Sequence, residues 1–377
     1  MEGGEVSRRE MTPDTSPAAP NDAPLSLNGL IVREQEPLNL EMPFSTLSGF
    51  TTPNESFYVR CHFPIPEIAA SDWRLKVEGE VEKPFELAYE ELLQLESRTI
   101  SATLECAGNN RIFLEPKVKG VQWGLGAVGN ASWTGVPLSA VLDRAGLKAG
   151  AMEVILEGAD EGEIANPPRP AGKIHFARSL PLSKARDDVL LAYEMNGEKL
   201  SASHGFPLRA IVPGWYAVAS VKWLRRIIVT DKVFAGYYQS IDYTYWERTD
   251  GGLPTLKPLA EQQIKAEISR PASGEVVAAN STIRIHGAAW CCDAEITEVD
   301  ISVDSGVTWN SARLLDDPVK NAWRLWEYDW RTPARPGPQT LLACATDSRG
   351  RIQPSGRDQD HGTYMINHVL PIQIEIR

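Results

Sequence analysis

The chain has 377 residues, of which 42% are hydrophobic and 23% charged, and this is the composition of an ordinary globular protein with room for two or three domains. Its formal net charge of -12 argues against a nucleic-acid partner, because phosphate binding needs a concentrated basic surface. No apolar stretch approaches the ~20 residues that a membrane helix needs, so we expect no membrane association.

The N-terminal residues are polar and proline-rich, and we expect residues 1–30 to form a flexible tail. Arg8 and Arg9 resemble the start of a twin-arginine export signal, but no apolar segment follows them. The chain as it stands is therefore expected to be cytoplasmic, and periplasmic if a signal was removed.

Residues 31–255 mix strand and helix patterns. No regular βαβ alternation and no glycine-rich phosphate-binding motif is present, so we expect an α+β domain that does not use a nucleotide cofactor. The expected strands are 74–81, 100–104, 152–157 and 221–230, and the expected helices are 89–95 and 138–145, the second ended by Gly146.

The composition from residue 251 to residue 258 is that of a linker. Short alternating segments follow at 283–286, 299–304 and 341–345, with turn signals between them. This spacing predicts an immunoglobulin-like β-sandwich over residues 256–377.

The five cysteines are too few and too irregularly spaced for a disulfide framework, and no CxxC pair suggests structural zinc. Cys106 stands apart, because it follows the apolar run 100–104 and precedes a small-residue turn and Arg111. A soft metal could take its sulfur as thiolate. The alternative is a small buried hydrophobic residue at the end of a strand.

Several segments in family order resemble the sulfite oxidase family of molybdenum enzymes. The segment around Cys106 is TLECAGNNR at residues 103–111. The others are FYVRCHFPIP (57–66), LLAYEMNG (190–197), HGFPLR (204–209) continuing to VPG (212–214), VKWL (221–224) and, more weakly, VDISVD (299–304) with Gly306 and Trp309.

The resemblance implies a molybdenum held by the two dithiolene sulfurs of one pterin, with Cys106 as the protein's metal ligand and no haem. It also implies that a small oxyanion, sulfite, is oxidised to sulfate, that electrons pass to an external acceptor such as a cytochrome or oxygen, and that the sandwich forms a homodimer. The implied substrate-side residues are Arg60, Arg111, Trp123, Tyr243 and Arg324, and the implied cofactor contacts are His62, Asp160, His204, Arg209, Ser220 and Lys222.

Arginine suits an oxyanion because its planar fork binds paired oxygens, and a few converging arginines can set a local positive field in an acidic protein. Taken alone, each arginine could equally be a surface ion pair and Trp123 a core residue. Tyr243 has tyrosine neighbours that could take its place, and the alignment around Arg324 can slip by one or two residues.

The chain departs from the family pattern at three places. Cys61 stands where the family usually has Asn, Asn110 where it usually has a second Arg, and residues 215–220 (WYAVAS) where it has a Gly-Ala-Arg-like run. The last change removes an arginine expected to contact the cofactor phosphate. It leaves open a different substrate, as in sulfane dehydrogenase or nitrate reductase, although nitrate reductase would bring haem and flavin modules. A non-catalytic cofactor-binding scaffold is a further alternative.

Overall fold

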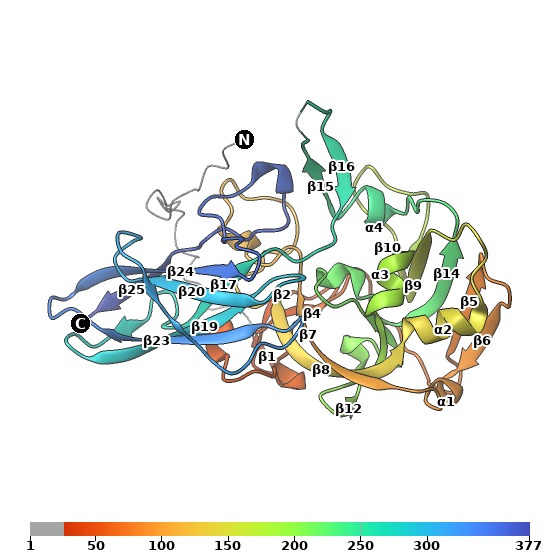
Figure 1. The fold of residues 1–377 in the computed structure, drawn as a ribbon, viewed down its shortest axis with the longest axis horizontal. Coiled ribbons are helices and arrows are strands. Elements are labelled where there is room, and N and C mark those ends of the chain that lie inside the picture. Colours follow the sequence, from red (N-terminus) through yellow and green to blue (C-terminus); the bar gives the residue numbers. More distant parts are fainter. Residues whose placement is uncertain (1–25, 250) are drawn as a thin grey trace.

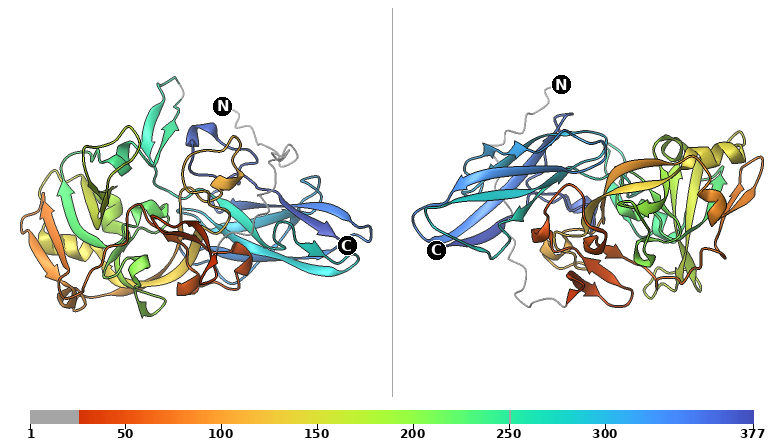
Figure 2. Two further views of the ribbon diagram at one scale, coloured as in Figure 1. Left: turned by 180° about the vertical axis from the view of Figure 1, so that it is seen from behind. Right: turned by 90° about the horizontal axis from the view of Figure 1, so that it is seen from below.

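The structure is a computed structural model that describes residues 26–249 and 251–377. These residues form a mixed lobe of sheets with short helices and a second lobe made of two facing sheets, which lie side by side in Figure 1. The same division is seen from behind and from below in Figure 2. The α+β fold with a C-terminal β-sandwich is thus confirmed. No helix in the described part of the chain is long and apolar enough to cross a membrane.

The mixed lobe is built on two larger sheets. The first has the order β10 (Ile174–Pro181), β9 (Glu153–Gly162), β14 (Leu224–Thr230), β5 (Arg74–Gly79), β6 (Phe85–Ala88). The second has the order β12 (Glu198–Lys199), β11 (Leu190–Met195), β8 (Val128–Pro137), β7 (Arg98–Glu105), with β13 (Arg209–Ile211) pairing with β11. Strand β14 runs parallel to β5 and antiparallel to β9, so the first sheet is mixed.

Smaller elements complete this lobe. A four-stranded sheet contains β1 (Ser26–Leu27), β2 (Leu30–Glu34), β3 (Asn39–Glu41) and β4 (Val59–Arg60), and a hairpin of β15 (Thr244–Glu247) and β16 (Thr255–Pro258) projects at the top of Figure 1. The α-helices are α1 (Tyr89–Leu92), α2 (Leu138–Ala145), α3 (Leu182–Asp187) and α4 (Tyr237–Ser240). In the described residues, the 3₁₀ turns of this lobe are η2 (Phe44–Thr46), η3 (Asn54–Ser56), η4 (Arg111–Phe113), η5 (Ala202–His204) and η6 (Ala217–Ala219), and η7 (Gln359–His361) belongs to the second lobe.

The sandwich packs two antiparallel-rich sheets over a common apolar core. One sheet has the order β17 (Lys265–Arg270), β19 (Thr282–Trp290), β23 (Arg324–Arg331), β22 (Arg313–Leu314). The other has the order β18 (Val276–Val277), β25 (Ile372–Ile376), β24 (Gly337–Asp347), β20 (Ile296–Ser302), β21 (Asn310–Ser311). Alternate residues of facing strands, such as Ile285, Val299 and Ile301, are buried together in that core, as the period-two pattern predicted.

Helix α2 shows how the local sequence sets an element. Its apolar residues Leu138, Val141, Leu142 and Ala145 fall on one face and are buried. Gly146 ends the helix with φ 67°, a left-handed value that glycine adopts without steric cost, and its N–H bonds back to the last turn. The predicted and observed bounds of this helix agree.

The two lobes meet along β7, the strand that leads to Cys106. The backbone of Thr103 donates to the carbonyl of Asn321 at 2.9 Å, and its hydroxyl accepts from the N–H of Trp323 at 2.7 Å. Trp290 and Trp323 from the sandwich are buried in one apolar cluster with Val59 of the mixed lobe. The second lobe therefore supports the strand end on which the candidate site is built.

The predicted divisions at residues 30 and 255 stay predictions. Of the expected tail, residues 1–25 lie outside the described residues. Ser26 and Leu27 are paired with Ile31 and Leu30, so the end of that segment is strand rather than flexible chain. Strand β16 runs through the predicted linker, because its pairing with β15 satisfies backbone groups that a free linker would leave to water.

Candidate active site

A partly enclosed cavity lies in the mixed lobe. It collects nine of the twelve residues that the sequence singled out: Arg60, His62, Cys106, Asp160, His204, Arg209, Ser220, Lys222 and Tyr243. Its apolar wall includes Phe57, Tyr58, Phe176, Val218 and Trp223. Three cationic side chains face one carboxylate in this lining, so the local field is positive although the whole chain is acidic.

Cys106 sits at the tip of β7, where the chain turns sharply. Its N–H donates to the carbonyl of Ala127, and its carbonyl accepts from the N–H of Asn109, both at 2.8 Å. The residue is 6% exposed, and burial raises the pKa of its thiol, while Arg60, Arg111 and the N–H of Gly108 oppose that rise. The fold therefore presents a fixed sulfur that needs a further positive centre to become a thiolate.

Tyr243 forms a polar group with His62 and Arg60 on the cavity wall. Its hydroxyl lies 2.6 Å from Nε2 of His62 and 3.4 Å from Nη2 of Arg60. Burial raises the pKa of Tyr243 to about 12, against the lowering effect of Arg60. Burial, then Arg60, Lys222 and Arg178, hold the pKa of His62 well below its usual range. The phenol thus keeps its proton and the imidazole is neutral, so this cluster offers hydrogen-bond donors to an anion.

A second group of lining residues, Lys222, Arg209 and His204, is held by hydrogen bonds to the backbone. Nζ of Lys222 donates to the carbonyl of Ser203 at 2.9 Å and to Sγ of Cys61 at 3.4 Å. Arg209 donates to the carbonyl of His204 at 3.0 Å, and its guanidinium lies 4.9 Å from the centre of the Trp133 ring. Burial and the neighbouring Arg209 and Lys222 lower the pKa of His204 to about 3, so this ring is neutral.

Two buried polar atoms in this part of the cavity have no hydrogen-bond partner. They are Oδ1 of Asp160 and Nε of Arg209, on residues that are 4% and 5% exposed. An orphaned buried acceptor and an orphaned buried donor each cost free energy unless a bound group pairs with them. A pterin offers amino groups to a carboxylate, and its phosphate accepts from arginine and lysine, so these residues fit the cofactor that the resemblance implies.

Replacing Asp160 by Asn is expected to stabilise the cofactor-free protein at pH 8. Burial raises the pKa of Asp160 to about 6 from 3.8, so the folded chain binds this proton more tightly than the unfolded chain. Below pH 3.8 the carboxyl is protonated and its burial costs no charge penalty. The penalty grows as the pH rises from 3.8 to about 6, and it is complete above about pH 6. At pH 8 the free energy of unfolding of Asp160→Asn should exceed that of wild type by up to about 3 kcal/mol. Urea unfolding measures this difference, which should be smaller at pH 5.

The exposed Asp317→Asn variant is the matched control and should leave stability unchanged at both pH values. In protein loaded with cofactor, Asp160→Asn is expected to lower stability instead. Oδ1 of Asp160 would then accept a hydrogen bond from the cofactor, and the substitution would remove that bond. Equal unfolding free energies for wild type and Asp160→Asn at pH 8 would contradict this account of the carboxylate.

Three predicted site residues do not line the cavity. Trp123 is fully buried behind it, with its ring 6.4 Å from that of Tyr58 and edge-on to it. Arg111 spans the two lobes: its Nε donates to the carbonyl of Thr363 in the second lobe at 3.0 Å, and its Nη1 donates to that of Val121 in the mixed lobe at 2.9 Å. Arg324 lies in β23 and donates to the carbonyls of Ile296 and Asp316, so backbone of the sandwich holds it away from the cavity, in contrast to the expectation.

The sequence departures also have definite places. Ala217 and Val218 line the cavity where the resemblance implies an arginine, while Tyr216 is buried and Trp215 packs against Lys184. Sequence reasoning missed Tyr58, Phe176 and Ser203 as lining residues. Phe57 and Tyr58 lie in the segment 57–66, and Ser203 directly precedes the segment 204–209. Their closeness to these two family-like segments could have indicated them.

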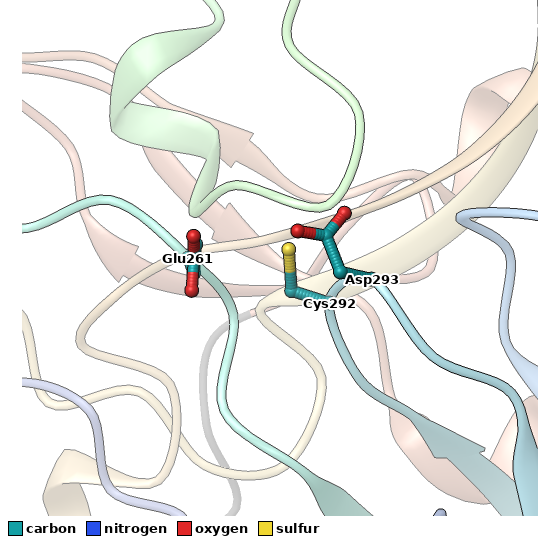
Figure 3. Close-up of side chains that lie close together, drawn as sticks. All are labelled: Glu261, Cys292 and Asp293. Atoms are coloured by element: carbon teal, nitrogen blue, oxygen red, sulfur yellow. The ribbon is translucent and has the colours of Figure 1, made fainter. Parts of the chain in front are cut away.

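A further group of side chains lies outside the cavity lining. In the described parts of the chain, Glu261, Cys292 and Asp293 place one ligand atom each within 4.8 Å of the others, and Figure 3 shows them side by side. Both carboxylates are exposed. Burial raises the pKa of the Cys292 thiol to about 12, so it stays protonated at neutral pH.

Comparisons with known proteins identify the family of the chain. Residues 62–238 match the family described as "Oxidoreductase molybdopterin binding domain", and residues 257–370 match "Mo-co oxidoreductase dimerisation domain". The chain is 35% identical to "Sulfite oxidase" from Gallus gallus over 373 residues, which cover 92% of this chain and 78% of the relative. The chain belongs to the sulfite oxidase family. The resemblance read from the sequence and the assignment to an oxidoreductase of this type are both confirmed.

Other members of the sulfite oxidase family are longer than this chain. "Sulfite oxidase, mitochondrial" is 36% identical in Drosophila melanogaster and 34% identical in Homo sapiens, and the matched region covers 85% and 88% of this chain. It spans 58% and 63% of those relatives. Among solved structures, the "Sulfane Dehydrogenase SoxCD from Paracoccus pantotrophus" superposes with a TM-score of 0.76 at 29% identity, covering 89% of this chain and 83% of that one.

Proposed function

We propose that this member of the sulfite oxidase family oxidises sulfite to sulfate and passes the electrons to an external acceptor. The observation that carries the proposal is the single cavity in which Cys106, Arg60 and Tyr243 meet the unpartnered atoms of Asp160 and Arg209. Arg60 and Tyr243 suit an oxyanion, Asp160 and Arg209 suit a pterin, and Cys106 belongs to the same lining.

Cys106 would be the protein ligand of the molybdenum, and Asp160, His204, Arg209, Ser220 and Lys222 would hold the pterin. When bound, this cofactor supplies oxygen transfer and two-electron chemistry, which no side chain provides. Arg60 would bind the anionic substrate through its planar fork. The Tyr243 phenol, protonated below its pKa of about 12, would donate a hydrogen bond to it. Neutral His62 would orient that phenol, and the apolar wall would limit water.

The test is metal analysis combined with sulfite-dependent reduction of ferricyanide, on wild type and on Cys106→Ser. We expect near-stoichiometric molybdenum in wild type and a loss of turnover of at least about 10³-fold in the variant, because the serine oxygen is a harder ligand than a thiolate. Cys344→Ser is the matched control, since Cys344 is a buried cysteine of the sandwich that does not line the cavity. Wild type without molybdenum, when the cofactor is available, would overturn the proposal.

A second candidate keeps the cofactor and changes the substrate. It is favoured by Ala217 and Val218, which line the cavity where the resemblance implies an arginine. The similarity to sulfane dehydrogenase and the 32% identity to "Nitrate reductase [NADH]" from Solanum lycopersicum name the substrates to try. Molybdenum-loaded protein that reduces ferricyanide with thiosulfate, or oxidises a reduced dye with nitrate, but does not turn over sulfite would select this candidate.

We further propose that the sandwich lobe forms a homodimer. The match of residues 257–370 to a dimerisation domain supports this state. The electron acceptor, whether a cytochrome or oxygen, and the cytoplasmic location stay predictions.

A further inference from the structure

The segment Thr363–Met365 of the second lobe lies directly against the turn that follows Cys106. The N–H of Met365 donates to the carbonyl of Ala107 at 2.9 Å, one residue after the cysteine. The carbonyl of Thr363 accepts from Nε of Arg111 at 3.0 Å. Tyr364, between them, is partly buried. A chain segment far away in the sequence is thus fixed to the candidate site at two points.

Tyr364 also contacts Tyr243, which lines the cavity. The two rings stack with 4.8 Å between their centres and 25° between their planes. The hydroxyl of Tyr364 donates to Oδ1 of Asp242, and this same oxygen accepts from the N–H of Tyr243 at 2.9 Å. Tyr364 therefore holds both the ring and, through Asp242, the backbone of Tyr243.

Tyr243 needs such support because its backbone is strained. Its φ of 54° lies in the left-handed region, which a bulky side chain adopts only where the surroundings enforce it. With the backbone released toward an ordinary φ, the hydroxyl would leave His62 and Arg60. The contact with Tyr364 thus bears on the hydrogen bonds inside the cavity.

The same aromatic ring lies beside Arg111. The guanidinium carbon is 5.1 Å from the centre of the Tyr364 ring. On its other sides the guanidinium runs so close to Gly108 and Gly120 that a Cβ on either would lie 2.3 Å or 2.7 Å from its nitrogens. Arg111 therefore occupies a slot made of backbone and one tyrosine ring, from which it influences Cys106 and Tyr243 electrostatically.

We propose that Tyr364 is a positioning residue of the active site, through which the second lobe fixes Tyr243 and Arg111 for binding of the substrate anion. The inference rests on the proposed function. Tyr364 does not line the cavity and touches no reacting atom; it acts through the two residues it holds. It also gives the second lobe a part in substrate binding.

The test compares Tyr364→Leu, Tyr364→Phe and wild type as cofactor-loaded protein. Leucine removes the stacking, the cation–π contact and the hydroxyl, and we expect kcat/KM for sulfite to fall about 30-fold, mostly through KM. Phenylalanine keeps the ring and loses only the hydroxyl, so kcat/KM for sulfite should fall by only about fivefold in Tyr364→Phe. The inhibition constant of sulfate, a non-reacting anion, should rise in parallel with KM, while molybdenum content stays at the wild-type value.

Tyr245→Leu is the matched control. Tyr245 also packs on the second lobe, with its ring edge-on to His361 at 5.9 Å, whereas the ring stacked on Tyr243 is that of Tyr364. Its kinetics should stay within twofold of wild type. A Tyr364→Leu enzyme with KM and kcat within twofold of wild type would overturn the proposal. If that variant does not fold, Tyr364→Phe decides, because a kcat/KM within twofold of wild type would contradict the fivefold fall expected when the hydroxyl no longer holds Asp242.

Failure of the proposed function can be told apart from failure of this inference. If wild type carries no molybdenum or does not turn over sulfite, the proposed function fails. The positioning role is then judged by a crystal structure of Tyr364→Leu without cofactor. The positioning role is supported if the Tyr243 hydroxyl has moved away from His62 and Arg111 has left its slot. It is overturned if both side chains keep their wild-type positions.

Discussion

Replacing Lys265 with methionine is expected to lower the free energy of unfolding by about 3–5 kcal/mol. Lys265 begins β17 in the second lobe, and its side chain is 2% exposed. Its Nζ donates to Oε1 of Glu105 at 2.6 Å, on a side chain that is 1% exposed. Methionine fills the volume of lysine but leaves the Glu105 carboxylate buried without a cation. Denaturation in urea at pH 7 measures the loss.

Of the two carboxyl groups near Lys265, Glu105 is the one that forms the ion pair. The indole N–H of Trp290 donates to its other oxygen at 2.9 Å, so both carboxylate oxygens accept hydrogen bonds from side chains of the second lobe. Burial raises the pKa of Glu267, 3.7 Å from Nζ, to about 8, so near neutral pH this second carboxyl is largely protonated. One cation and one anion therefore balance across the interface between the lobes.

Two variants control this prediction. The exposed Lys232→Met should change stability by less than about 0.5 kcal/mol. The double variant Lys265→Met with Glu105→Leu should be more stable than Lys265→Met alone, because it removes the buried charge rather than isolating it. A single variant within about 1 kcal/mol of wild type would show that water reaches Glu105 and that the pair does not hold the lobes together.

The Glu105–Lys265 pair also shows what the sequence could not provide. The two residues are far apart in the chain, and a period-two pattern gives no partner for an inward-facing charge. By contrast, the turn after Cys106 was predictable, because a strand ending in small residues is a local signal. The same holds for helix α2, whose apolar face and glycine end are set by neighbouring residues.

Local motifs located the cavity residues better than they located their orientation. Cys106, Arg60 and Tyr243, which the sequence singled out, line one cavity, since each lies in or beside a strand end or turn that the fold brings there. Arg111 lies only five residues after Cys106, yet its side chain turns away, because carbonyls of Val121 and Thr363 compete for its donors. No sequence pattern indicated Tyr364, because its contacts with Tyr243 and Arg111 form only when the two lobes pack together.

Replacing Arg60 with methionine is expected to lower kcat/KM for sulfite by about 10³-fold. Arg60 and Tyr243 are the cationic and phenolic groups whose polar atoms meet in the cavity, 3.4 Å apart. Loss of the guanidinium removes the charge that attracts the anion and the fork that orients its oxygens. Lysine should recover part of the activity, because it restores the charge but not the paired geometry.

Metal content separates this effect from damage to the cofactor site. The unpartnered atoms that suit the pterin belong to Asp160 and Arg209, not to Arg60, so Arg60→Met should keep its molybdenum. Sulfate inhibition should be lost together with sulfite turnover. The exposed Arg335→Met, on the sandwich, is the control and should match wild type. Full activity in Arg60→Met would mean that the positive field needed by the anion comes from Lys222 and Arg209 instead, and that the substrate enters from their side of the cavity.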